Sequence, residues 1–78
     1  MDPAAVIRNR LLAAEPDLAA SAVTPDARMS DLIPDSMTRL DMLTEVLEEL
    51  GITASLRDFA GAGTVGELTD LVATRVAG

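Results

Sequence analysis

Leucines spaced three and four residues apart make the segment from Ser36 to Leu50 the strongest constraint on the fold. Four of them fall on one face of a helix: Leu40, Leu43, Leu47 and Leu50. Such a stripe is typical of an amphipathic helix that buries one face. We therefore predict a helix over these residues with this face in the core, flanked by Met37 and Val46. Gly51 suits the left-handed position that follows a helix end.

The opposite face of this helix is mostly acidic. Its residues are predicted to face water: Thr38, Asp41, Met42, Glu45, Glu48 and Glu49. Met42 is thus expected to be exposed among carboxylates, which favours a docking surface over a face that serves solubility alone. Arg39 is the only basic residue between Asp31 and Leu50. It either tunes which partner docks or is a solvated arginine paired with Asp35 or Asp41.

Ser36 begins the leucine helix and directly follows Pro34 and Asp35. Proline resists helix continuation from upstream, and aspartate or serine can accept hydrogen bonds from the unpaired amides of the first turn. By themselves these residues indicate only a capped helix start. A helix N-terminus also favours an anion, so a phosphodiester on Ser36 would be stabilised there, and an arm attached to it would be exposed.

A first helix is predicted from Pro3 to Ala14, with Asp2 as its cap and proline at its first position. Its apolar stripe recurs at helical spacing: Ala4, Ile7, Leu11 and Ala14. Arg8 and Arg10 lie off this stripe, so we expect both to point to water.

One long loop and two more helices complete the predicted fold. Residues 15–34 show no sustained period, but their scattered apolar residues should pin the loop onto the core, and a helical turn is expected at residues 25–28. A short helix is predicted between Thr53 and Ala60. Thr64 and Glu67 form a capping box that begins the last helix. The buried stripe of that helix is predicted to contain Val65, Leu68, Leu71, Val72 and Val76. The fold class is therefore all-α: a four-helix bundle with three longer helices, one short third helix and a long first loop.

The composition excludes several classes of function. The 78-residue chain has no cysteine and no histidine, which excludes cysteine nucleophiles, Ser-His-Asp triads, disulfides and the usual Cys/His zinc sites. No catalytic set and no metal site can be assembled from the remaining residues, so we predict that the protein is not an enzyme. Its net charge of −7 argues against binding to nucleic acid or an anionic membrane and favours basic protein partners.

The length allows one small domain with a modest core, and residues 1–78 are predicted to form that single domain. No stretch is apolar enough for a secretory signal or a membrane span, which predicts a cytoplasmic location. Met1 resembles an initiator methionine and the tail after Val76 is short, so we expect a free-standing protein, although an excised domain given a start codon would look the same. We also expect a monomer.

The motif at Asp35-Ser36-Met37, followed by the leucines and acids of residues 40–49, resembles the Asp-Ser-Leu motif and second helix of acyl and peptidyl carrier proteins. The resemblance includes residues 64–68, Thr-Val-Gly-Glu-Leu, and in spacing it covers nearly the whole chain. Two positions depart from the family pattern. Pro34 stands where the family usually has glycine, and Met37 stands where leucine or isoleucine is commoner. Neither change removes the serine hydroxyl, but Pro34 stiffens the approach to it.

The resemblance implies that Ser36 carries a 4′-phosphopantetheine arm, donated by coenzyme A through a separate phosphopantetheinyl transferase with magnesium. Asp35 would help to present Ser36 to this transferase. Acyl or aminoacyl groups would be tethered to the arm as thioesters, loaded by an acyltransferase or an adenylating ligase and passed to a downstream synthase or transferase. The residues expected to contact these partners are Met37, Arg39, Asp41, Met42, Glu45, Val46, Glu48 and Glu49.

Two alternatives stay open at the level of function. The alanine-rich, lysine-free composition and residues 55–59 look more like carriers of polyketide or nonribosomal peptide (antibiotic-type) biosynthesis than like the fatty-acid carrier, which is the alternative within the family. The second alternative is a small acidic helical adaptor that binds a basic protein and holds no prosthetic group. In that case Ser36 would be only a helix cap.

Overall fold

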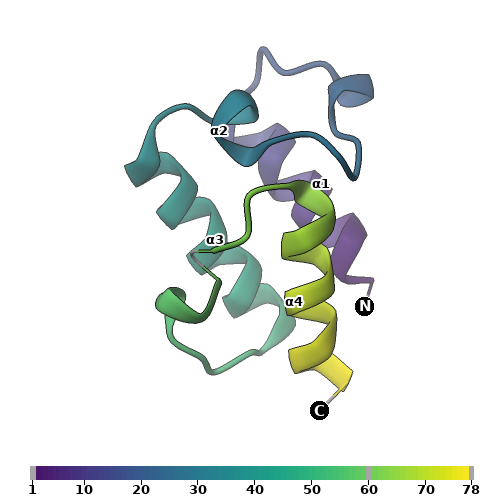
Figure 1. Cartoon of the computed structure of the whole chain (residues 1–78). Coiled ribbons are helices and arrows are strands. Elements are labelled where there is room, and N and C mark those ends of the chain that lie inside the picture. The colour runs from purple at the N-terminus through teal and green to yellow at the C-terminus, as the bar shows by residue number, and fades with distance from the viewer. Residues whose placement is uncertain (1, 60, 78) are drawn as a thin grey trace.

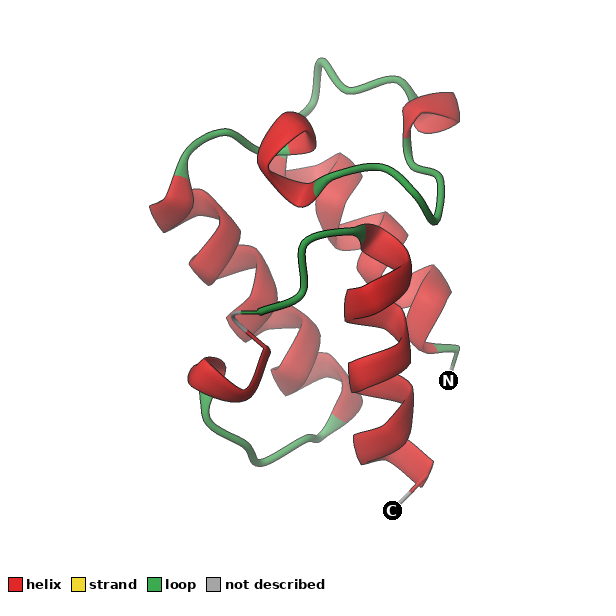
Figure 2. Ribbon diagram, in the orientation of Figure 1, coloured by secondary structure: helices red, strands yellow, loops and turns green. Residues whose placement is uncertain are grey.

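Three long helices surround the core of the chain, whose computed structural model describes residues 2–59 and 61–77. They are α1 (Pro3–Ala14), α3 (Ser36–Leu50) and α4 (Val65–Ala77). Shorter elements connect them: the 3₁₀ helix η1 (Ala20–Ala22), α2 (Met29–Leu32) and the 3₁₀ helix η2 (Leu56–Phe59). Figure 2 shows helices and loops and no strand in the described parts of the chain. The predicted all-α fold, with three longer helices, one short helix before the last and a long first loop, is confirmed.

The first helix has its predicted bounds, because its start is determined locally. Asp2 precedes the helix in an extended conformation, and its carboxylate accepts a hydrogen bond from the amide of Ala4 at 3.2 Å. Pro3 occupies the first turn, where the missing amide hydrogen costs no helical hydrogen bond. Ile7 and Leu11 of the predicted stripe are fully buried.

The helical turn expected at residues 25–28 is not observed there; the helical residues begin about one turn later, at Met29, the first residue of α2. Residues 24–27 form a single turn, in which the amide of Ala27 donates to the carbonyl of Thr24 at 3.0 Å, and this segment also hydrogen-bonds to the start of α4. The amides of Val65 and Gly66 donate to the carbonyls of Ala27 and Pro25 at 3.0 and 2.8 Å. Backbone groups that bond across the chain in this way are not available for a local helical turn.

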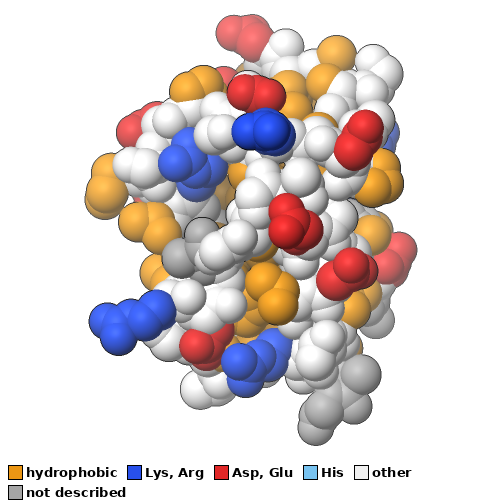
Figure 3. All heavy atoms as spheres, viewed as in Figure 1, with side chains coloured by type: hydrophobic (Ala, Val, Ile, Leu, Met, Phe, Trp, Pro, Cys, Tyr) orange, Lys and Arg blue, Asp and Glu red, His pale blue; other side chains and the backbone are white. Residues whose placement is uncertain are grey.

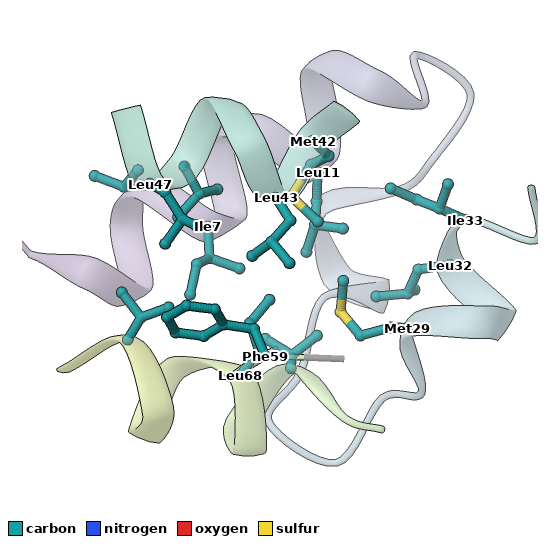
Figure 4. Close-up of a cluster of buried hydrophobic side chains, with 14 residues drawn as sticks. Ile7, Leu11, Met29, Leu32, Ile33, Met42, Leu43, Leu47, Phe59 and Leu68 are labelled. Atoms are coloured by element: carbon teal, nitrogen blue, oxygen red, sulfur yellow. The ribbon is translucent and has the colours of Figure 1, made fainter. Parts of the chain in front are cut away.

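The scattered apolar residues of the first loop do pin it onto the core, as predicted. Met29, Leu32 and Ile33 belong to the buried core, and the partly buried Leu18 and Val23 pack against that core. Figure 4 shows Met29, Leu32 and Ile33 in one cluster with side chains of α1, α3 and α4.

The core face of α3 differs from the predicted one. Met42 is only 2% exposed, whereas Leu40 is 40% and Met37 63% exposed, so the predictions for these three side chains are wrong. Leu43, Val46 and Leu47 are buried as predicted. At 3.6 residues per turn, the centre of the buried face is rotated by about 50° from the centre of the face marked by the four leucines. The physical reason is that α3 packs against α1 on one side and η2 on the other, which places the centre of the contact beside Val46.

The ends of the last two long helices follow their sequence signals. Gly51 ends α3 with φ 70°, in the left-handed region that glycine adopts readily. The amide of Glu67 donates to Thr64 Oγ1 at 3.1 Å and the amide of Thr64 donates to Glu67 Oε1 at 3.1 Å, which confirms the capping box.

The buried stripe of α4 is narrower than predicted. Val65, Leu68 and Val72 are buried, but Leu71 and Val76 are largely exposed. In the short element before it, Phe59 is buried and Leu56 packs against the core, whereas Ala60, the predicted end of this helix, lies outside the described residues. None of the described helices combines the length and apolar character needed to cross a membrane.

Candidate functional site

Ser36 lies where the loop after α2 becomes α3, and its side chain is exposed. In Figure 1 this end of α3 is at the left edge of the molecule, away from both termini. The first-turn amides of a helix have no partners within the helix and carry its positive dipole end. A hydroxyl at this position is therefore accessible to another protein and lies close to groups that favour an anion.

Asp35 occupies the N-cap position, but it does not form the expected cap. Its carboxylate accepts a hydrogen bond from Thr38 Oγ1 at 2.7 Å, and no first-turn amide donates to it with hydrogen-bond geometry. The Thr38 hydroxyl holds the pKa of Asp35 below its ordinary value of 3.8, slight desolvation opposes this, and the amides of Met37 and Thr38 and the Arg39 guanidinium add to the lowering. The first turn of α3 therefore has no side-chain cap hydrogen bond, although the amides of Met37 and Thr38 lie close enough to the Asp35 carboxylate to favour its ionised form.

Arg39 binds backbone carbonyls instead of an acid. Its Nη1 donates to the carbonyl oxygens of Ile33 at 2.6 Å and Pro34 at 3.0 Å. Of the two alternatives for Arg39, the pairing with Asp35 or Asp41 is not observed: among the described residues, no salt bridge joins Arg39 to either acid. No signal in the sequence distinguished these acceptors, because carbonyl oxygens are present at every residue.

A pocket of about 240 Å³ opens beside Ser36. Ser36 and Arg39 contribute its polar edge, and the rest is apolar: Met29, Leu40, Met42, Leu43, Phe59, Ala62 and Leu68. The side chains come from α2, α3, the segment around η2 and α4, so only the tertiary fold brings them together. A flexible arm attached at Ser36 could lay apolar atoms in this pocket and reduce their contact with water.

One family model matches the chain: the phosphopantetheine attachment site, over residues 9–72. This range contains the start of α3, the pocket beside it and most of the core. The chain belongs to the phosphopantetheine-binding carrier protein family. Searches of curated proteins and of solved structures gave no match.

The carrier protein is not an enzyme, because members of this family hold the group on which other enzymes act. Their cofactor is covalently attached 4′-phosphopantetheine, which supplies a terminal thiol for thioester formation. The residues at the start of α3 fit this group: the Ser36 hydroxyl is exposed, the first turn has no side-chain cap hydrogen bond, and an apolar pocket lies alongside. The described residues contain no group of acids that could hold a metal ion.

Two of the eight residues expected to contact partners of the carrier are unavailable. Met42 and Val46 are buried in the core, where Figure 4 shows Met42 beside Leu11 and Leu43. Neither side chain can touch a protein that docks on the folded carrier, so these two predictions are wrong.

Exposed apolar side chains do lie near Ser36 on α3, but they belong to Met37 and Leu40. Figure 3 shows hydrophobic side chains at the surface over the first turns of this helix. The sequence-based prediction placed Leu40 in the core. Its exposure could not be derived from helical spacing, since either rotation of α3 buries a comparable number of apolar residues.

The acidic side chains of α3 fall into two groups. Arg10 of α1, which was expected to point to water, binds Glu49 at 2.7 Å and Glu45 at 3.3 Å. Neither Asp41 nor Glu48 forms a salt bridge with any described residue. Part of the acidic charge on α3 is thus used within the molecule, whereas Asp41 and Glu48 are exposed and unpaired among the described residues.

Proposed function

We propose that Ser36 is the residue that carries the 4′-phosphopantetheine arm, and that the protein tethers acyl or aminoacyl intermediates as thioesters on that arm. The observation that carries this proposal is the position of Ser36: an exposed hydroxyl at the N-terminus of a 15-residue helix, inside the range that matches the family. Ser30 is also exposed, but it lies within the four-residue α2.

In the loading reaction, Ser36 Oγ attacks the phosphorus of coenzyme A that is bonded to the pantetheine oxygen. A new Oγ–P bond forms as the P–O bond of the diphosphate breaks, and adenosine 3′,5′-bisphosphate leaves. The hydroxyl proton passes to a base of the transferase, because the described residues near Ser36 include no histidine and only the strongly acidic Asp35. The carrier itself contributes accessibility, a fixed helix start and amides that stabilise the negative phosphodiester.

The surface around Ser36 supports contact with basic enzymes. Met37 and Leu40 offer apolar contact area, while Asp41 and Glu48 offer negative charge on the same helix. Partners of this chemistry include the transferase, a loading enzyme (an acyltransferase or an adenylating ligase) and a downstream synthase or transferase. Charge at such a surface acts mainly on the rate of encounter.

The pathway is proposed on composition alone. Absence of lysine, richness in alanine and residues 55–59 support polyketide or nonribosomal peptide biosynthesis over fatty-acid synthesis. Loading assays with malonyl, fatty acyl, aryl and aminoacyl donors, each with its own loading enzyme, separate these cases. Selective loading with fatty acyl groups would contradict the proposed pathway while leaving the carrier function intact.

The attachment residue is tested by intact-mass measurement after incubation with coenzyme A, magnesium and a broad-specificity phosphopantetheinyl transferase. We expect the wild type and Ser30→Ala to gain the mass of one phosphopantetheinyl group and Ser36→Ala to gain none. Circular dichroism should show the same helical content for all three proteins. Modification of folded Ser36→Ala, or no modification of the wild type, would show that Ser36 is not the attachment residue.

A further inference from the structure

The side chain of Arg39 binds two of the three backbone carbonyls that lead into Ser36. Its side-chain Nη1 donates to the carbonyls of Ile33 and Pro34, at 2.6 and 3.0 Å. Its own amide donates to the carbonyl of Asp35 at 3.1 Å. The bond to Asp35 is the ordinary backbone bond of the first helical turn, so the side chain of Arg39 is specific for the carbonyls of Ile33 and Pro34.

This segment has few other hydrogen bonds that could hold it. Pro34 has no amide hydrogen, and no described backbone amide donates to the carbonyl of Ile33 or Pro34. The side chain of Ile33 is fully buried, whereas Pro34, Asp35 and Ser36 are exposed. The amide of Ile33 donates to the carbonyl of Met29 at 2.8 Å, and the Asp35 carboxylate accepts from Thr38 Oγ1 at 2.7 Å. Between these two points, Arg39 makes the only hydrogen bonds from described residues to the carbonyls of Ile33 and Pro34.

The surroundings of Arg39 strengthen these bonds. Its side chain is half-buried and lines the apolar pocket beside Ser36. A hydrogen bond from a charged donor is stronger than one between neutral groups, and partial exclusion of water raises its strength further. Nη1 carries two hydrogens, so it can bind both carbonyls at once without distorting the planar guanidinium.

We infer that Arg39 is a positioning residue for phosphopantetheine transfer, which holds the Ile33–Asp35 segment so that the Ser36 hydroxyl is presented in one orientation. The inference rests on the proposal that Ser36 is the attachment residue. Arg39 acts through the backbone and touches neither the phosphorus nor coenzyme A. Its loss should therefore reduce the rate of transfer within the complex more than the affinity of the complex, since the exposed side chains of Met37 and Leu40 stay in place.

The test measures kcat and KM for modification of the full-length apo protein by a broad-specificity transferase with coenzyme A. Arg39→Met keeps an unbranched apolar stem and removes the donors, and Arg39→Lys restores a charged donor. Arg8→Met is the matched control, because it removes the same charge from an exposed position on α1. We expect Arg39→Met to lower kcat about tenfold with KM changed less than about twofold, Arg39→Lys to recover part of kcat, and Arg8→Met to behave as wild type.

A second readout reports the orientation of the segment itself. Amide ¹⁵N order parameters of residues 35–37 should fall from about 0.85 to below about 0.6 in Arg39→Met and stay unchanged in the middle of α1. A positioning role requires this local loss together with the lower kcat.

Three results would overturn the inference: a kcat of folded Arg39→Met within twofold of wild type, unchanged order parameters at residues 35–37, or a folded Arg39→Lys no faster than Arg39→Met. If Arg39→Met does not fold, the comparison of Arg39→Lys with wild type decides: a lower kcat with little change in KM and lower order parameters at residues 35–37 supports the inference, and a wild-type kcat overturns it. Failure of the attachment proposal is distinct, because then the wild type is not modified or Ser36→Ala still is.

Discussion

Two methionines of α3, five residues apart, should respond in opposite ways to the same substitution. Met42 is 2% exposed and lies in the core, while Met37 is 63% exposed and lies next to Ser36. We expect Met42→Ala to destabilise the protein. In the folded fraction, the exposed residues of α3 near Ser36 should be unchanged. Met37→Ala should leave stability unchanged and slow modification and loading.

The magnitudes follow from burial. Replacement of a buried methionine by alanine costs roughly 2–5 kcal/mol, because the transfer free energy of the removed atoms is lost and a cavity remains. Met42 packs among side chains of α1 and α3, so we take about 3 kcal/mol for Met42→Ala. A domain of this size loses about 4–8 °C in Tm per kcal/mol, which predicts a fall of roughly 12–24 °C. Met37→Ala removes an exposed side chain and should change the free energy of unfolding by less than about 0.5 kcal/mol.

Urea unfolding followed by circular dichroism gives both free energies, and the transferase assay gives the modification rates. Met42→Leu is the matched control, because it keeps the apolar volume and should cost less than about 1.5 kcal/mol. Equal destabilisation by Met37→Ala and Met42→Ala would refute the assigned rotation of α3, and so would a normal Tm for Met42→Ala.

Three further outcomes are expected. Gly66→Ala should lower the free energy of unfolding by about 1–2 kcal/mol, because a Cβ at this position would lie 2.9 Å from the carbonyl oxygen of Pro25. In the control Gly61→Ala, the new Cβ meets nothing within 4 Å. Thermal unfolding compares the two variants, and equal unfolding would contradict the prediction. Because the pKa of Asp35 is lowered from 3.8 in the folded protein, its ionised form stabilises the fold above pH 3.8, and this contribution is lost as the pH falls through the folded pKa. Asp35→Asn should therefore lose less Tm than wild type as the pH falls below 3.8. Parallel curves of Tm against pH for the two proteins would count against this prediction. Glu48→Lys should slow modification by a basic transferase several-fold at low salt, and the difference from wild type should shrink at high salt. The control Asp17→Lys, which makes the same charge change in an exposed loop, should not slow modification. The same salt-dependent loss of rate in both variants would indicate an effect of net charge rather than of a docking surface.

Local sequence signals predicted the helix boundaries well. Asp2, Gly51 and the Thr64–Glu67 capping box each act within a few residues of their own position, so their effects need no knowledge of the rest of the fold. The same locality explains why Ser36 could be identified as the candidate site. Its motif is contiguous, and the exposure of a helix N-terminus follows from the loop before it.

Long-range contacts were not predicted. The carbonyls of Pro25 and Ala27 accept hydrogen bonds from the start of α4, about forty positions later, and the helical turn forms afterwards, at α2. Arg10 contacts Glu45 and Glu49 because α1 and α3 pack side by side, and nothing in the spacing of charges required that pair. Periodicity identifies that a helix has an apolar face but does not locate the neighbouring helices around it.

The sequence by itself therefore determined an all-α fold, the three long helices and a serine at the start of the acidic one, because caps, glycine and hydrophobic period act along the chain. The tertiary structure alone decided which side chains of that helix are available to partners. Met42 and Val46 are buried and Met37 and Leu40 exposed because α1 and η2 flank α3 at a rotation that helical spacing permits but does not select. The bonds of Arg39 to the Ile33 and Pro34 carbonyls have the same origin, since they form only once the loop after α2 has folded against that helix.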